Sequence, residues 1–143
     1  MKEFEMEQKM HELGKLIGLE DDSNLYPMVT TKDDLFPDGS SLYYSRGKYH
    51  YVGMDRGEEV EHHKARDLTE IMYWVFETIT FSIANDYELR HRNENEDPRR
   101  QLFSKQLELL GKISPQYRMA EEKEIKEILK EAPFRDEAFP LHF

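Results

Sequence analysis

The sequence predicts an α+β fold with an N-terminal helix, a small three-stranded antiparallel β-meander, a long central helix and two further C-terminal helices. Three observations support this prediction: a capping box opens an apolar run at 67–87, the apolar period alternates over 41–66, and two later amphipathic stretches begin with proline. The length of 143 residues is usual for one domain. We therefore expect a single domain over 1–143, with its core over about 41–132, an irregular connection over about 20–40 and a tail over 133–143.

The central helix is predicted from the spacing of Asp67 and Glu70. Asp67 can accept a hydrogen bond from the first free amides of the helix, and Glu70 can reach back to the amide of Asp67. Apolar residues then recur at helical spacing, and further aromatic residues widen the apolar face, which is typical of a helix buried on most sides. The recurring residues are Leu68, Ile71, Met72, Val75, Ile79, Ile83 and Tyr87, and the aromatic residues are Tyr73, Trp74, Phe76 and Phe81.

The stretch before the central helix predicts three strands joined by short turns. Tyr, Val and Ser alternate there as on a pleated surface, and glycine follows arginine at 46–47 and 56–57, where a tight turn needs a positive φ. On the middle strand Tyr49 and Tyr51 share one face, while His50 lies on the other. The pattern leaves open which face is buried. One face is expected to pack on the central helix, because a small isolated sheet is only marginally stable.

Amphipathic spacing predicts the remaining helices. One runs from about Phe4 and stops at Gly18, and two others start at the Asp-Pro of 97–98 and the Ser-Pro of 114–115, since proline suits the first helical turn. The first of these two should pack along the central helix as an antiparallel hairpin. Pro133 ends the last helix, and four apolar residues of the tail could dock on the domain: Phe134, Phe139, Leu141 and Phe143.

The net charge limits the classes of ligand. The chain carries 30 Asp and Glu against 20 Lys and Arg, a formal charge of -10. Nucleic acid is therefore not an expected ligand, because phosphate binding needs a basic surface, whereas an acidic surface favours a basic protein partner or simply keeps the chain soluble. The N-terminus has no secretory signal, no run is apolar enough for a membrane, and there is no cysteine, so the cytoplasm is the expected location.

The sequence lacks the common signatures of catalysis, such as the Walker loop and the G-x-S-x-G elbow. The best metal candidate is the pair His62-His63, with further potential ligands nearby at Glu59, Glu61, His50 and Asp67. Adjacent strand residues point to opposite faces, so His62 and His63 are not expected to share a metal ion. Paired carboxylates lie in polar stretches, where ordinary solvation is expected. The sequence thus predicts no catalytic residue, no cofactor and no metal ligand.

A partner-binding surface is predicted around the turn at 56–57. Tyr49 and Tyr51 lie on the strand before it, and carboxylates flank the turn, a combination that is typical of protein interfaces. The carboxylates are Asp55, Glu58, Glu59 and Glu61. The alternative is that the tyrosines pack against the central helix and the carboxylates are merely solvated. Both interpretations stay open.

Five strings of the sequence point to a known family. They are KYHYV at 48–52, RGEEVEHH at 56–63, DLTEIMYWVF at 67–76, YELRHR at 87–92 and RRQLFSKQLELLGK at 99–112. They fall in one continuous block over 43–113, about half of the chain. This block resembles the immunity protein 63 family of bacterial polymorphic-toxin systems, while the first helix and the tail lie outside it.

The resemblance implies a protein that binds a cognate toxin and blocks it, and that is not an enzyme. It supplies no catalytic or toxin-contact residues to transfer. The acidic charge fits a toxin with a basic cleft, such as a nuclease, although charge does not identify the toxin as one. Two alternatives stay open: a small hydrolase that uses His50, His62 or His63 with a metal or a glutamate, and a regulatory or scaffold homodimer. Monomer and weak homodimer are both compatible with the sequence.

Overall fold

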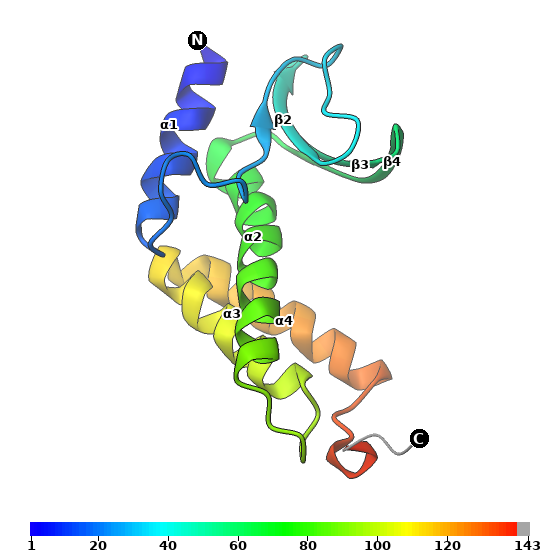
Figure 1. The fold of residues 1–143 in the computed structure, drawn as a ribbon. Helices are drawn as coiled ribbons and strands as arrows, with labels where there is room; N and C mark the ends of the chain where they lie inside the picture. The colour runs from blue at the N-terminus through cyan, green and yellow to red at the C-terminus, as the bar shows by residue number, and fades with distance from the viewer. Residues whose placement is uncertain (140–143) are drawn as a thin grey trace. The chain divides into compact units, whose positions relative to one another are not determined.

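The computed structural model describes residues 1–139 and has an α+β fold, as the sequence predicts (Figure 1). The four α-helices of these residues are α1 (Lys2–Lys15), α2 (Leu68–Arg90), α3 (Arg99–Ile113) and α4 (Pro115–Glu131), followed by the short 3-10 helix η1 (Asp136–Ala138). The four strands are β1 (Met28–Val29), β2 (Ser40–Ser45), β3 (Lys48–Asp55) and β4 (Glu58–Ala65).

The chain divides into two compact units, Met1–Phe76 and Glu77–Phe143, with the boundary inside α2. The first unit contains α1, the sheet and the first turns of α2. The second contains the rest of α2 together with α3 and α4. The single domain over 1–143 stays a prediction. Of the apolar tail residues, Leu141 and Phe143 lie outside the described residues.

The sheet has the order β1-β2-β3-β4 and is mixed. Strands β2, β3 and β4 form the predicted antiparallel meander, but β1 adds a fourth strand that is parallel to β2, so the prediction of three strands is wrong in this detail. Two residues are too few to show an alternating pattern, and β1 is a strand only because it meets β2. The amide of Thr30 donates to the carbonyl of Leu42, 3.0 Å away, and extends this pairing.

Both predicted turns have the conformation that their glycines favour. Arg46 and Arg56 have φ of 52°, and Gly47 and Gly57 have φ of 81°. Positive φ at both central residues defines a type I′ turn, whose twist matches that of the two flanking strands. The two hairpins therefore place their turns at opposite ends of β3.

The start of α2 is fixed by the predicted cap. The amide of Glu70 donates to Asp67 Oδ1 over 2.8 Å, which satisfies one of the free amides of the first turn. Only Arg66 separates the end of β4 from Asp67, so the connection between the sheet and the helix is very short. Ile71, Met72 and Val75 are fully buried, as the predicted apolar face requires. Phe81, which the sequence also assigned to this face, is 47% exposed, so the expectation of burial on most sides is wrong for the later part of α2.

In the second unit, α3 returns antiparallel to the part of α2 that begins at Glu77, as predicted (Figure 1). The side-chain amide of Gln106 donates to the carbonyl of Glu77 over 3.0 Å, and that of Gln101 donates to the carbonyl of His91 over 2.8 Å. Gln106, the later of the two residues in α3, thus contacts Glu77, the earlier of the two in α2, which is the order of an antiparallel pair. Gln106 is 1% exposed, so its hydrogen bond satisfies a polar group that would otherwise be costly to bury.

An ionic cluster joins the start of α3 to the end of α4. Asp97 is 4% exposed and accepts hydrogen bonds from the backbone and guanidinium of Arg99 and from the amide of Arg135. Arg99 also donates to the carbonyls of Ala132 and Pro133, which follow the last turn of α4. These contacts, the hydrogen bond from the Arg99 side chain first, lower the pKa of Asp97 to about 2.

A close approach of α1 to the segment before β1 gives a test of this packing. Alanine in place of glycine inside a helix ordinarily stabilises by about 1 kcal/mol. At Gly14, however, an added Cβ would lie 1.8 Å from Tyr26 Oη. We therefore expect Gly14→Ala to lower the free energy of unfolding by roughly 1–3 kcal/mol, measured by urea denaturation.

The control for this prediction is the double-mutant cycle with Tyr26→Ala, which removes the obstructing ring. In that background Gly14→Ala should become neutral or stabilising. If Gly14→Ala stabilised the otherwise unchanged chain, the close packing of α1 on Tyr26 would be contradicted.

Candidate protein-binding surface

The two faces of the sheet have different side chains, and the strand register assigns them. Opposite residues of an antiparallel pair share a face. Tyr51 is opposite His63, and Val52 is opposite His62. We call the face with Tyr51 and His63 the inner face, and the face with Val52 and His62 the outer face.

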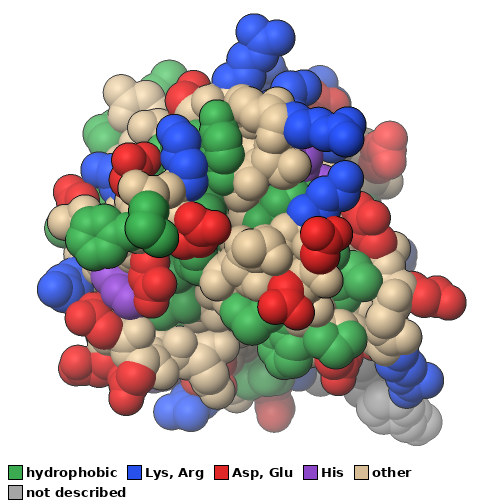
Figure 2. All heavy atoms as spheres, turned by 90° about the horizontal axis from the view of Figure 1, so that it is seen from above, with side chains coloured by type: hydrophobic (Ala, Val, Ile, Leu, Met, Phe, Trp, Pro, Cys, Tyr) green, Lys and Arg blue, Asp and Glu red, His purple; other side chains and the backbone are tan. Residues whose placement is uncertain are grey.

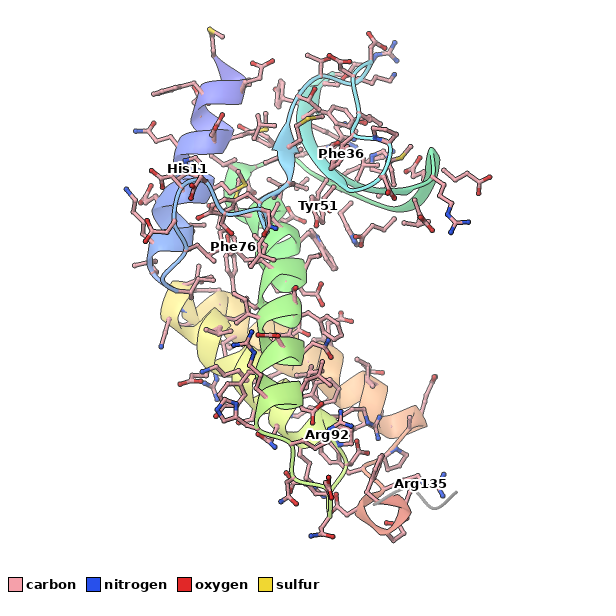
Figure 3. All side chains as sticks on the ribbon, in the orientation of Figure 1. His11, Phe36, Tyr51, Phe76, Arg92 and Arg135 are labelled. Carbon is pink, nitrogen blue, oxygen red and sulfur yellow. The ribbon has the colours of Figure 1, made fainter. Side chains whose placement is uncertain are left out.

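The inner face is covered within the first unit. The ring of His63 stacks on that of Trp74 from α2 with centroids 3.9 Å apart, and Tyr51 stacks on His63 at 6.4 Å. Near the other end of β3, Lys2 Nζ of α1 donates to Tyr49 Oη over 3.4 Å. Figure 3 shows Tyr51 on the side of the strand that looks toward α2. The sheet therefore packs on the central helix through the face that carries the tyrosines.

The burial of Tyr49 and Tyr51 bears on the predicted binding surface. They are 5% and 1% exposed. Tyr51 stacks on His63, whose ring in turn stacks on Trp74 of α2, while Tyr49 contacts Lys2 of α1. The exposed fraction of both tyrosines is small. Their contacts hold β3 against the helices.

A β-bulge in β4 decides which acidic residues reach the outer face. Gly53 is opposite Glu61, but the next residue of β3, Met54, is opposite Glu59, so Val60 has no partner of its own. An extra residue reverses the alternation of side chains beyond it. Glu59 consequently lies on the outer face, Glu61 stays on the inner face, and Val60 is pushed outward with 65% of its surface exposed.

The four carboxylates of the predicted surface are thereby divided. Glu59 Oε1 lies 2.5 Å from Nδ1 of His62, and Glu61 Oε2 lies 3.3 Å from Nε2 of His63. Asp55 and Glu58 face each other across the Arg56-Gly57 turn, and both are exposed. Within residues 1–139 neither of these two forms an ion pair. The turn therefore presents two exposed carboxylates to solvent, with the exposed Arg56 between them in the chain.

Two histidines link this acidic turn to the middle of the outer face. Nε2 of His62 lies 2.8 Å from Nδ1 of His50, and the ring of His50 stacks on that of Tyr43 with centroids 4.6 Å apart and an angle of 2°. The result is a row of side chains from Glu59 through His62 and His50 to Tyr43.

Burial is the main cause that lowers the pKa of His50 in this row. The neighbouring His62 and the nearby Lys64 and Lys48 lower it further.

This pairing was not visible in the sequence, because the bulge sets it. A regular hairpin about the Arg56-Gly57 turn would place His50 opposite His63. The bulge shifts the register by one, so that His50 is opposite Lys64 and diagonal to His62. The expected separation of His62 from His63 does hold, since one pairs with His50 and the other stacks on Trp74. Among residues 1–139 no group of three or more His, Cys, Asp and Glu could hold a metal ion.

Comparison with known proteins gives one match. The family model for immunity protein 63 matches residues 45–127, more than half of the chain and a range that includes β3, β4, α2 and α3. No curated protein and no solved structure matches. In the part of the chain that is described, no helix combines the length and the apolar character that crossing a bilayer would require.

The histidine row predicts a pH dependence of stability. Folding lowers the pKa of His50, and burial is the main cause. At pH values below the ordinary pKa of about 6.5, the unfolded chain therefore binds a proton at His50 that the folded chain does not bind. Stability is therefore lost as pH falls from about 7 through the folded pKa. We expect His50→Phe, which keeps the ring stack on Tyr43, to lose less stability between pH 7 and pH 5 in urea denaturation.

The matched control is His91→Phe, which replaces another histidine stacked on a tyrosine, Tyr87, and should keep the pH dependence of the unchanged chain. Identical pH slopes for the unchanged chain and His50→Phe would show that His50 titrates normally in the folded protein.

Proposed function

The chain belongs to the immunity protein 63 family, and from that premise we propose that it neutralises a cognate toxin by binding it stoichiometrically, without chemistry of its own. The single observation that carries the proposal is the family match, which covers both strands of the β3–β4 hairpin. Support from the residues is independent. The hairpin ends in exposed carboxylates, whereas its histidines are engaged with Glu59, His50 and Trp74 rather than arranged around a substrate.

We further propose that the toxin contacts the end of this hairpin. Asp55, Glu58 and Glu59 supply the charge, and Val60, exposed by the bulge, supplies an apolar centre among them. An apolar residue enclosed by polar ones is the usual arrangement of an interface. Glu61 lies at the margin of this contact, and Tyr49 and Tyr51 contribute by fixing β3 from beneath.

The complementary toxin surface is basic. A net charge of -10 attracts such a surface over several ångströms and accelerates association, more strongly at low ionic strength. A nuclease with a phosphate-binding cleft is one toxin class with a surface of this kind. The proposal requires only the basic surface and not a particular toxin activity.

The test of this function uses Asp55→Lys/Glu58→Lys and, as the candidate toxin domain, the C-terminal domain of the protein encoded by the adjoining upstream gene. Electrostatic steering predicts that the reversal lowers the association rate constant about 10- to 100-fold at low salt and weakens its salt dependence, measured by stopped-flow mixing. Cells that co-express the unchanged chain with the toxin should survive, and cells with the variant should survive less well.

A matched control is Glu124→Lys/Glu131→Lys, two exposed glutamates of α4 whose reversal makes the same change in net charge. This control should bind almost as fast as the unchanged chain. Equal rates for both reversals would remove the β3–β4 turn from the interface, and no rescue by the unchanged chain would contradict the proposed function.

A further inference from the structure

The outer face carries a second charged feature at the opposite end of β3. A pocket of about 250 Å³ opens there, lined by Lys32, Arg46, Lys48 and Lys64 together with Tyr43 and His50. We call these residues the basic pocket. Four cations thus meet at one small opening of a chain whose formal charge is -10. Figure 2 shows acidic side chains spread over the face it presents, with Lys and Arg gathered near a histidine along one side.

The cations of the basic pocket have no internal counter-charge. Within residues 1–139, no carboxylate forms an ion pair with Lys32, Arg46, Lys48 or Lys64. Some cations elsewhere in the described residues do have such partners, as in the pairs of Arg92 with Glu88 and Arg99 with Asp97, and the basic pocket differs in bringing four unpaired cations to one opening. Cations held close together without a carboxylate repel one another, and an anion from outside relieves that repulsion.

The fold, rather than chance, brings these side chains together. Arg46 occupies the first central position of the β2–β3 turn, Lys48 is opposite Ser45, and Lys64 is opposite His50. The floor is Tyr43, which is 4% exposed and stacked on His50. Burial first, then His62, lower the pKa of His50, and Lys64 and Lys48, which line the same pocket, lower it further.

We propose that the basic pocket binds an oxyanion, and that in the complex this group is a carboxylate side chain of the toxin. The second half of this inference rests on the proposed function. A carboxylate from a protein fits better than a polyanion, because one group of four cations cannot offset the repulsion of a long phosphate chain by the rest of this acidic protein.

The inference predicts a single orientation of the bound toxin. The acidic turn and the basic pocket lie at opposite ends of β3, whose eight residues span roughly 23 Å. The toxin then needs a basic patch and an acidic side chain at about that separation. A partner docked the other way round would place like charges together, which disfavours wrong partners and wrong orientations.

The first experiment uses the free chain with sodium acetate and inorganic phosphate as probes, against chloride at constant ionic strength. The pH titration of His50 is followed by NMR. An anion in the pocket offsets Lys48 and Lys64, so the midpoint of His50 should move up toward its ordinary value in both anions. Lys48→Gln/Lys64→Gln should abolish the anion-dependent part of that shift, and Lys123→Gln/Lys126→Gln in α4 should preserve it.

The outcomes separate the alternatives. No difference from chloride in either anion would overturn the basic pocket as an anion site. A response to phosphate without one to acetate would overturn the carboxylate assignment. The titration of His50 is measured on the free chain, so its result does not depend on the proposed function.

The second experiment measures the affinity of the complex with the same candidate toxin domain. Lys48→Gln/Lys64→Gln should weaken binding about 10-fold or more, while Lys123→Gln/Lys126→Gln should leave it unchanged. Binding by the unchanged chain with equal affinity for the pocket variant would overturn this inference and leave the proposed function intact. Failure of the unchanged chain to bind would instead count against the proposed function.

Discussion

The β-bulge at Val60 is the constraint on which the arrangement of the sheet depends. It reverses the alternation of β4, so that Glu59 shares the outer face with His62 while Glu61 shares the inner face with His63. Without it, His63 rather than His62 would lie near His50, and the ring that now stacks on Trp74 would be missing from the contact with α2. One unpaired residue thus fixes both the attachment of the sheet to the helix and the charges that it presents outward.

The histidine pair joins the two charged ends of the outer face. His50 lines the basic pocket, and His62 pairs with a carboxylate of the acidic turn. Burial first, then His62 and the two lysines of the pocket, lower the pKa of His50, and Glu59 pairs with His62. One row of neighbouring side chains therefore connects the acidic turn to the basic pocket.

Local chemistry explains what could be predicted from the sequence. The Asp67 cap, the two Arg-Gly turns and the helical periodicity of α2 involve residues close together in the chain, so their patterns were sufficient. The prolines at the starts of α3 and α4 were informative for the same reason. The family was also visible, because its strings cover a continuous stretch.

The rest depended on contacts between distant residues. Strand β1 exists only through its pairing with β2, and no pattern of two residues could reveal it. The bulge has no signature in the alternation around Val60, so the division of the four carboxylates and the pairing of His50 with His62 could not be derived. The basic pocket was missed because Lys32 and Lys64 are far apart in the chain and meet only in the folded sheet.

The central claim is that the toxin binds the β3–β4 hairpin, at its Arg56-Gly57 turn and along its outer face. Hydrogen–deuterium exchange of the chain, free and with the candidate toxin domain, tests this claim most directly. The account predicts slower exchange on binding in the Arg56-Gly57 turn and the bulge at Val60, together with the Arg46-Gly47 turn at the other end of β3. Protection confined to α3 and α4, with both turns unchanged, would contradict it.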